Sequence, residues 1–424
     1  MKILLITQAL RVGGGVEQVV TTLGNYLMEK GYEVSFLTLY HKYSKSDHPL
    51  HKLNGGYSTL NEVFINKGGK NIIGIIGNEF QRFIVQLKLF ITGPIRINRR
   101  ISNLKPDLVI SFCEDVNLLL LAGKLLFKNK TKTFVCIHSN PEKQYRFGSL
   151  IGAFWHFILI TINIKKLYLY SHLIIPVSEG IKQLLVSYKI PEERVFVIPN
   201  PHDLVNYQKK SMNTDFSELN SLFKNNFVFI NIGRLIRSKG HFHLIKSFNH
   251  IAKDRDNIKL IIIGEGHLMK DIRQFIRKLG LENKVFLLGI QTNVFPFIKQ
   301  SSCFVFSSFF EALPNVIIES LALNTCVIST DCETGPREIL CPELSLVETV
   351  RYPYYGKYGI LTSPVMEFDT PSKPNQALDD LSSAMRSIIE NPDVKRRYQS
   401  VYERANDFDI NRVMPIWERI IKAK

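Results

Sequence analysis

The sequence contains no C-x-x-C pair, no long uninterrupted apolar run and no phosphate loop of the G-x-x-x-x-G-K-[ST] type. Its 6 cysteines are scattered, which argues against a disulfide framework and against a zinc site, so we expect buried thiols in a reducing cytoplasm. The apolar run after Met1 is too short for a signal peptide, and we expect the first strand there.

Two segments resemble ligand motifs but are incomplete. In residues 13–18 (Gly-Gly-Gly-Val-Glu-Gln), Gln18 stands where a dinucleotide fingerprint requires its third glycine, which disfavours a dehydrogenase. Asp254 and Asp256 have the D-x-D spacing of a metal site, but they precede an expected strand, whereas metal-binding carboxylates belong just after one. We expect a solvated turn there and no metal.

Short apolar segments alternate with helical patterns along the whole chain, which predicts parallel sheets covered on both faces. A chain of 424 residues is long enough for two or three domains, each with its own core. In such sheets, ligands bind at the carboxyl ends of the strands. The expected strands are residues 2–7, 33–39, 107–111, 132–137 and 172–176 in the first half, and 228–232, 259–263, 285–288, 303–306 and 326–329 in the second.

The chain divides most naturally at residues 199–201, Pro-Asn-Pro, because prolines break secondary structure and a polar stretch follows. A helix is expected at 16–30, directly after the glycine-rich loop. Residues 41–81 show little periodicity and indicate a long, partly ordered insertion.

Residues 310–319 (Phe-Glu-Ala-Leu-Pro-Asn-Val-Ile-Ile-Glu) carry two glutamates on either side of a turn. A helix is expected at 316–323 with Asn315 as its N-cap, so that Glu311 lies in the loop and Glu319 about one turn into the helix. Helix amides suit a phosphate, and carboxylates suit sugar hydroxyls. An ordinary strand-loop-helix unit with two surface acids is the alternative.

A second charged pair follows the strand at 228–232. Arg234 provides a planar guanidinium group with several donors and Lys239 provides an ammonium point charge, and together they could bind a diphosphate. Glycines at 264, 266 and 289 follow the next two strands, where they would let a base or ribose approach the backbone closely.

With these residues in place, the chain resembles the family 4 glycosyltransferases of the GT-B class, which are retaining, nucleotide-sugar-dependent enzymes. The resemblance extends in family order over nearly the whole chain. Its matching segments are residues 14–17 (Gly-Gly-Val-Glu), 177–180 (Val-Ser-Glu-Gly), 198–201 (Ile-Pro-Asn-Pro), Gly233-Arg234 with Lys239-Gly240, 264–266 (Gly-Glu-Gly), the Glu311/Glu319 pair, and Thr330-Asp331 with 335–338 (Gly-Pro-Arg-Glu).

The resemblance implies an α/β fold of two Rossmann-like domains facing each other across a cleft. Residues 1–200 would bind the acceptor, residues 202–395 the nucleotide sugar, and a helical segment at 396–424 would return to the first domain. It also implies that Arg234 and Lys239 bind the diphosphate, Glu319 the ribose and Glu311 the transferred sugar. The further donor-binding positions that it implies are Gly14, Gly15, Gly233, Gly264, Gly266, Leu313, Pro314, Asn315 and Val316.

His138 directly follows the expected strand at 132–137, and so it lies at a strand end. A lone histidine is more often structural. The family, however, places a histidine in this loop close to the donor sugar, and the resemblance therefore adds His138 to Arg234, Lys239 and Glu311 as a catalytic residue. It implies neither a metal ion nor a cofactor.

The net charge of +16 is concentrated in the first 200 residues, where 25 Lys and Arg minus 13 Asp and Glu give +12. Apolar residues at 83–91 lie close to Lys88, Arg96, Arg99 and Arg100, and residues 147–164 are uncharged and mostly apolar, interrupted by polar residues such as His156 and Asn163. Both segments suit an anionic membrane surface, and no recognised nucleic-acid module is present, so nucleic acid is not expected as a partner. A buried helix at 147–164 with a solvated basic face is the alternative.

Residues 330–338 (Thr-Asp-Cys-Glu-Thr-Gly-Pro-Arg-Glu) resemble a loop common in bacterial transferases for surface polysaccharides and lipid-linked oligosaccharides. This resemblance favours a UDP-sugar donor, a hexose or N-acetylhexosamine, and a saccharide or polyprenyl-diphosphate-linked acceptor. The enzyme would be cytoplasmic and peripheral on the inner face of the membrane. Two alternatives stay open: a catalytically silent GT-B binding subunit and a nucleotide-sugar 2-epimerase.

Overall fold

The computed structural model describes residues 1–8, 15–39, 57–59, 79–141, 143, 164–212, 220–365 and 375–423. Gly14, most of the expected insertion at 41–81 and nearly all of the segment 147–164 lie outside the described residues. The chain forms two compact units, Met1–Pro199 together with Met414–Lys424, and Asn200–Val413. Of the expected C-terminal segment 396–424, only the last part therefore belongs to the first unit.

The first unit contains a six-stranded sheet with the order β3-β2-β1-β4-β5-β6, in which all paired strands are parallel. The five strands predicted in this half are confirmed, with ends that differ by at most one residue. The sixth, β3, lies within the expected insertion. The strands are β1 Lys2–Thr7, β2 Glu33–Thr38, β3 Tyr57–Thr59, β4 Leu108–Phe112, β5 Lys132–Ile137 and β6 Leu173–Pro176.

Helices cover this sheet because their apolar sides pack on its continuous apolar strands. The helices are α1 Gly15–Glu29, α3 Glu79–Leu104, α4 Glu114–Leu126 and α6 Glu179–Ser187, with 3-10 turns at Tyr168–Tyr170 and Glu192–Arg194. In α6, Ser178 is the N-cap and accepts a hydrogen bond from the Ile181 amide at 3.4 Å. A Cβ added to Gly123 of α4 would lie 2.7 Å from the Pro94 carbonyl oxygen of α3, so this close helix approach requires glycine.

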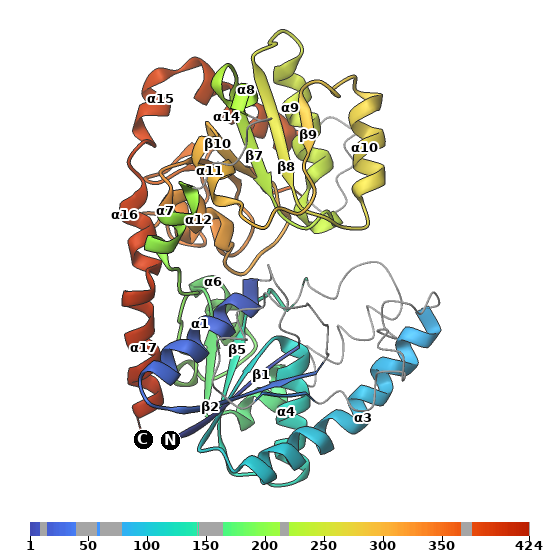
Figure 1. Cartoon of the computed structure of the whole chain (residues 1–424), viewed down its shortest axis with the longest axis vertical. Helices are drawn as coiled ribbons and strands as arrows, with labels where there is room; N and C mark the ends of the chain where they lie inside the picture. Colours follow the sequence, from blue (N-terminus) through green and yellow to red (C-terminus); the bar gives the residue numbers. More distant parts are fainter. Residues whose placement is uncertain are drawn as a thin grey trace. The chain divides into compact units, whose positions relative to one another are not determined.

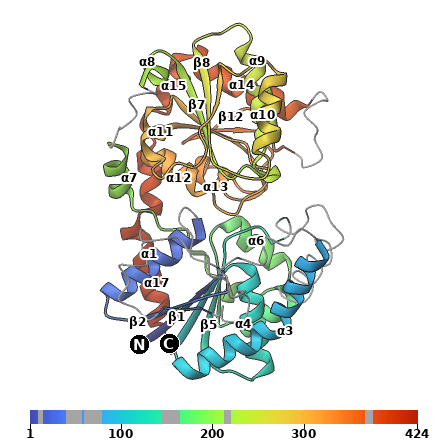
Figure 2. The ribbon, with the colours of Figure 1, turned by 45° about the vertical axis from the view of Figure 1, so that its right-hand side comes forward.

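The C-terminal helix α17 (Ile410–Lys422) begins in the second unit and ends in the first. Within the first unit its end packs beside α1, as Figures 1 and 2 both show, and the Tyr26 hydroxyl donates to Glu418 at 3.1 Å. Trp417 is buried. This packing makes the end of the chain part of the first unit's fold.

The second unit contains a seven-stranded sheet with the order β12-β13-β11-β10-β7-β8-β9. All its pairs are parallel except β12 with β13. The five strands predicted in this half are confirmed within one residue, whereas β12 and β13 were not predicted. The strands are β7 Phe227–Ile232, β8 Ile258–Ile263, β9 Val285–Leu287, β10 Cys303–Phe306, β11 Cys326–Thr330, β12 Tyr354–Tyr355 and β13 Ile360–Thr362.

Helices also cover the second sheet, and α9 packs against α14 (Figure 2). Between these two helices, the Ser247 hydroxyl donates to the Leu378 carbonyl at 3.1 Å. The helices are α7 Leu204–Ser211, α8 Asn220–Lys224, η6 Arg237–Lys239, α9 His241–Ala252, α10 Met269–Lys278, α11 Phe295–Gln300, α12 Asn315–Ala322, α13 Pro336–Leu340, α14 Gln376–Glu390, α15 Pro392–Arg397, α16 Tyr402–Ala405 and η7 Asn406–Phe408.

The side chains confirm the expected state of the cysteines, because all are free thiols and all but the half-buried Cys113 are buried. Within the described ranges, no helix combines the length and the apolar character that crossing a membrane requires. In the expected surface segment 83–91, the prediction is wrong for Leu89, which is buried in the core of the first unit, and Phe90 packs against the same core. Ile91 is exposed.

Candidate functional site

Two loops of the second unit bring a cation and a carboxylate into contact. Lys239 ends η6 in the loop after β7, and Glu311 lies in the loop after β10. Their Nζ and Oε1 atoms form an ion pair, and the side chains of Lys239 and Glu311 are only 21% and 18% exposed. Because β10 is parallel to its neighbour β7, both loops leave the same edge of the sheet.

Arg234 lies in the same loop as Lys239 and is exposed. Its guanidinium group makes no ion pair within the residues that the structure describes. Lys239, by contrast, is held on two sides, since its Nζ also lies 5.7 Å from the centre of the Phe306 ring. The loop after β7 therefore carries one cation that is ion-paired, Lys239, and one that is exposed, Arg234.

The glycines of the second unit have two different surroundings. Gly264 has a φ of 139°, and an added Cβ would lie 2.0 Å from the Gly233 carbonyl oxygen. At Gly266, an added Cβ would lie 2.2 Å from the Leu235 carbonyl oxygen. Both glycines thus let the loop after β8 pack on the loop after β7, a reason that the sequence did not reveal. At Gly289 nothing lies within 4 Å of an added Cβ.

The start of α12 differs from the prediction. The expected N-cap, Asn315, is the first helical residue, and Pro314 precedes it without a side-chain cap. The Asn315 side chain is engaged elsewhere, because its Oδ1 accepts a hydrogen bond from Asn200 at 2.7 Å. Leu313 and Pro314 are buried and Val316 is half-buried. The first amides of α12 therefore have no capping side chain, which suits an anion.

Glu319 lies within α12, as predicted from the sequence. Burial raises the pKa of its carboxyl to about 7, and the positive charge of Lys210 acts in the opposite direction. The side chain is therefore divided between its neutral and ionised forms near neutral pH.

In the first unit, His138 directly follows β5 and is half-buried, with its ring stacked on Phe112 at 5.7 Å. Gly15 is the first residue of α1. His138 and Gly15 thus belong to the first unit, whereas Arg234, Lys239, Glu311 and Glu319 belong to the second.

Sequence reasoning missed two acids at the edge of the first sheet where His138 lies. Glu114 follows β4 and is only 3% exposed. Burial raises the pKa of its carboxyl to about 7, although hydrogen bonds from Ser139 act in the opposite direction. Its neighbour Asp115 accepts a hydrogen bond from Gln8 at 2.6 Å. The available signal was the pair of acids immediately after an apolar strand.

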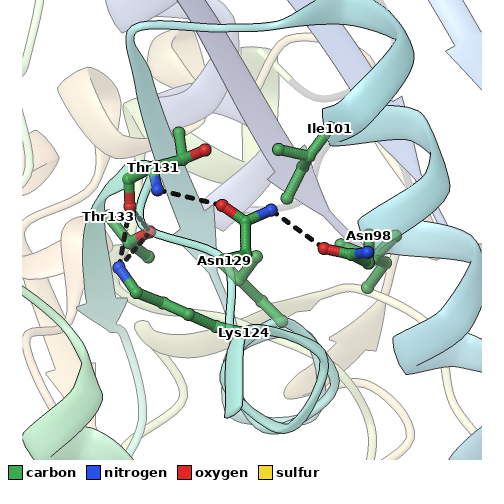
Figure 3. Close-up of a pocket in the computed structure, with 8 residues that line it drawn as sticks. Asn98, Ile101, Lys124, Asn129, Thr131 and Thr133 are labelled. Carbon is green, nitrogen blue, oxygen red and sulfur yellow. Dashed lines mark hydrogen bonds between the residues drawn. The ribbon is translucent and has the colours of Figure 1, made fainter. Parts of the chain in front are cut away.

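A small cavity lies at the opposite end of the same sheet, where Thr131 precedes β5 (Figure 3). There Lys124 Nζ donates to the Thr131 carbonyl at 2.7 Å and to the Thr133 hydroxyl at 3.3 Å. Burial lowers the pKa of Lys124 to about 8. The cavity volume of about 10 Å³ would hold about one water molecule, so we assign it a structural role. Among the described side chains, no group of three or more His, Cys, Asp or Glu could hold a metal ion.

Two protein families match most of the chain. Residues 13–205 match Glycosyltransferase Family 4, and residues 213–349 match Glycosyl transferases group 1. An uncharacterised glycosyltransferase of Methanocaldococcus jannaschii is 41% identical over 342 residues, which cover 77% of this chain and 82% of the relative. The chain belongs to glycosyltransferase family 4.

Two relatives from Campylobacter jejuni have named activities. An N-acetylgalactosamine-N,N'-diacetylbacillosaminyl-diphospho-undecaprenol 4-alpha-N-acetylgalactosaminyltransferase is 31% identical over 58% of this chain and 63% of the relative. A GalNAc-alpha-(1->4)-GalNAc-alpha-(1->3)-diNAcBac-PP-undecaprenol alpha-1,4-N-acetyl-D-galactosaminyltransferase is 24% identical over 99% of this chain and 98% of the relative.

Solved structures establish the fold. Anabaena HepE in complex with UDP and glucose superposes with a TM-score of 0.71 at 17% identity, covering 100% of both chains. The sucrose-phosphate synthase of Thermosynechococcus elongatus gives a TM-score of 0.72 at 15% identity, covering 99% of this chain and 98% of that chain. The predicted GT-B fold with two Rossmann-like domains is confirmed.

Proposed function

We propose that the protein transfers a hexose or an N-acetylhexosamine from a UDP-sugar, with retention, to a saccharide or polyprenyl-diphosphate-linked acceptor. The product would enter a surface polysaccharide such as lipopolysaccharide or capsule. The observation that carries the proposal is the contact between Lys239 and Glu311 at the edge of the second sheet. The undecaprenol-linked acceptors named for the Campylobacter relatives support the acceptor class, and the UDP complex of HepE supports the donor class.

In this proposal each residue binds one part of the donor. Arg234 and Lys239 bind the diphosphate, the uncapped start of α12 adds backbone amides, and Glu319 accepts hydrogen bonds from the ribose. Glu311 contacts the transferred sugar, and His138 acts close to that sugar. The donor-binding role that the family resemblance implies is proposed for five glycines as well: Gly14, Gly15, Gly233, Gly264 and Gly266.

Electrostatics would supply much of the catalysis. The bond between the anomeric carbon and the diphosphate oxygen breaks while negative charge builds on the leaving group, which preorganised cations stabilise. The acceptor hydroxyl attacks the anomeric carbon from the face that the diphosphate leaves, and its proton goes to a diphosphate oxygen. We assign no covalent nucleophile. By family resemblance we also propose that the reaction needs no divalent ion or cofactor, so EDTA should leave turnover unchanged.

The test combines a donor screen with turnover. Thermal shift with a panel of UDP- and GDP-sugars identifies the donor, because a ligand that binds the native state raises its stability. Turnover is then measured with and without a polyprenyl-diphosphate-linked saccharide. Arg234→Ala and Lys239→Ala should each lower turnover by about 100-fold or more with the fold intact. A fully active Arg234→Ala, Lys239→Ala double variant would refute the assignment.

The same measurements separate the alternatives. A silent GT-B subunit would bind a nucleotide without turnover under any acceptor condition. A nucleotide-sugar 2-epimerase would convert its nucleotide sugar without an acceptor. The joint presence of Arg234, Lys239, Glu311 and Glu319 favours the transferase over the silent subunit.

We also propose that the enzyme is cytoplasmic and binds the anionic inner surface of the membrane through α3. On this helix Ile91 and Ile95 are 61% and 50% exposed, and Arg99 is exposed as well. Their spacing of four residues places all three on one face of the helix. Apolar and basic side chains on one helix face suit the headgroup region of an anionic bilayer.

A further inference from the structure

The loop after β11, residues 331–335, is fixed at its start by an ion pair. Arg337 Nε donates to both carboxylate oxygens of Asp331, at 3.2 and 3.1 Å, and its Nη2 donates to Oδ2. The Tyr352 hydroxyl donates to the same Oδ2 at 2.7 Å. The Arg337 and Asp331 side chains are only 11% and 3% exposed. A planar guanidinium on a shielded carboxylate is a strong and geometrically specific contact.

Arg337 also ties this loop to the chain that follows α13. Its Nη1 donates to the carbonyls of Ser345 at 3.1 Å and Glu348 at 2.5 Å. Burial, together with the hydrogen bond to Asp331, raises the pKa of Tyr352 well above its usual range, so its hydroxyl stays a donor at physiological pH. The start of the loop is thereby held from several directions.

The other end of this loop packs directly on the loop that carries Glu311. The Thr334 hydroxyl donates to the Glu311 carbonyl oxygen. Gly335 has a φ of 94°, and an added Cβ would lie 2.6 Å from Pro314 Cδ and 2.8 Å from the Ala312 carbonyl oxygen. No side chain fits between the two loops at this point. A shift of the Thr334 loop would therefore shift Glu311.

Glu311 is consequently held at two points from two different strands. Lys239, after β7, holds its carboxylate, and Thr334, after β11, holds its backbone. When a donor binds, its diphosphate would weaken the ion pair between Lys239 and Glu311, because both anions then interact with the same ammonium group. The Thr334 contact is neutral and does not depend on that charge, so it would keep Glu311 in place in the donor complex.

We propose that Thr334 is a positioning residue that sets the carboxylate of Glu311 for the transferred sugar, with Asp331, Arg337 and Tyr352 holding the loop of Thr334. This inference rests on the proposed function, in which Glu311 contacts the sugar and other residues contact the nucleotide. It predicts that the loop after β11 governs the sugar-dependent part of donor binding and leaves the nucleotide-dependent part unchanged.

The test compares the affinities for UDP and for the UDP-sugar with the largest thermal shift, measured by calorimetry. Thr334→Val keeps the shape but removes the hydroxyl. One neutral hydrogen bond is worth about 1 kcal/mol, so we expect about fivefold weaker UDP-sugar binding and UDP binding within about twofold of wild type. Turnover should fall as well. Thr334→Ser restores the hydroxyl and should recover both quantities.

Thr325→Val is the matched control. The Thr325 hydroxyl is also buried and donates to a backbone carbonyl, that of Ile298 at 3.0 Å, but it has no contact with Glu311. Its loss should lower the melting temperature without changing the ratio of the two affinities. Equal weakening of UDP and UDP-sugar by Thr334→Val, or no change in either, would overturn the inference. Failure of the wild type to bind any nucleotide would instead overturn the proposed function.

Discussion

Lys239 and Glu311 form an ion pair although their positions in the chain are 72 residues apart. In the proposed function the two partners serve different parts of one ligand, the diphosphate and the sugar. A bound diphosphate would therefore compete with Glu311 for the charge of Lys239. Mutation of Glu311 can separate this competition, measured as a change in UDP affinity, from the contribution of Glu311 to turnover.

The first prediction concerns this pair. Glu311→Gln should bind UDP about two- to fivefold more tightly than wild type, because removing the carboxylate leaves the full charge of Lys239 to the diphosphate. The same variant should lose turnover, since the contact with the sugar is weakened. Calorimetry with UDP and steady-state assays measure the two effects. Glu282→Gln, the same change at an exposed position of the same unit, should alter neither.

The second prediction follows from the pKa of Glu319, which burial raises to about 7. Below that pH the carboxyl is mostly neutral, and above it the carboxylate is the stronger acceptor for ribose hydroxyls. UDP affinity should therefore rise between pH 6 and pH 8, by up to about tenfold if binding requires the ionised form. Phosphate ionisation of UDP also contributes over this range.

Glu319→Gln separates the two contributions, because it leaves the phosphate ionisation in place. The variant should show a smaller rise in UDP affinity across the same pH range and weaker binding at pH 8. Parallel pH profiles for wild type and variant would show that the ionisation of Glu319 does not govern donor binding.

The third prediction compares two glycines with the same backbone conformation, Gly240 and Gly280, which both have a φ of 66°. At Gly240, which follows Lys239, an added Cβ would lie 2.0 Å from the Ser307 carbonyl oxygen, whereas nothing lies within 4 Å at Gly280. Both alanine variants should be about 1 kcal/mol less stable than wild type, because a residue with a Cβ adopts the left-handed conformation at a cost.

Only Gly240→Ala should lose more than that, and only this variant should also lose donor affinity, because the clash displaces Lys239. Urea denaturation gives the stabilities, and calorimetry with UDP gives the affinities. Equal stability losses for the two variants would mean that the loop after β7 adjusts freely next to β10.

The fourth prediction concerns the membrane. Wild type should sediment with anionic liposomes at low ionic strength and less at high ionic strength, because salt screens exposed charges. An Ile91→Ser, Ile95→Ser, Arg99→Ser variant should bind these liposomes several-fold more weakly. Its melting temperature should be unchanged, since all three side chains are exposed.

A Val205→Ser, Met212→Ser variant provides the control, since these apolar side chains are 57% and 76% exposed in the second unit. It should bind like wild type. If wild type binds neutral vesicles equally well, or does not bind anionic ones, a water-soluble acceptor is the better answer.

The fold followed closely from the sequence, and the local details at the site followed less well. The segments 132–137 and 303–306 are mostly apolar and too short for a buried helix, which is typical of buried strands, and both were predicted to the residue. The N-cap at Asn315 was wrong because Asn200, from a distant part of the chain, engages its side chain. Glu114 was missed because a polar side chain after a strand does not reveal its own burial.

The sequence by itself determined the alternation of strands and helices, and with it two parallel sheets, in each of which the loops that follow the parallel strands leave one edge. The order of the strands was decided only in three dimensions. β10 lies between β7 and β11, although β8 and β9 intervene in the chain. That order brings Lys239 and Thr334 to Glu311 from opposite sides. Apolar periodicity sets the type of each element, whereas packing and pairing between elements decide which loops meet.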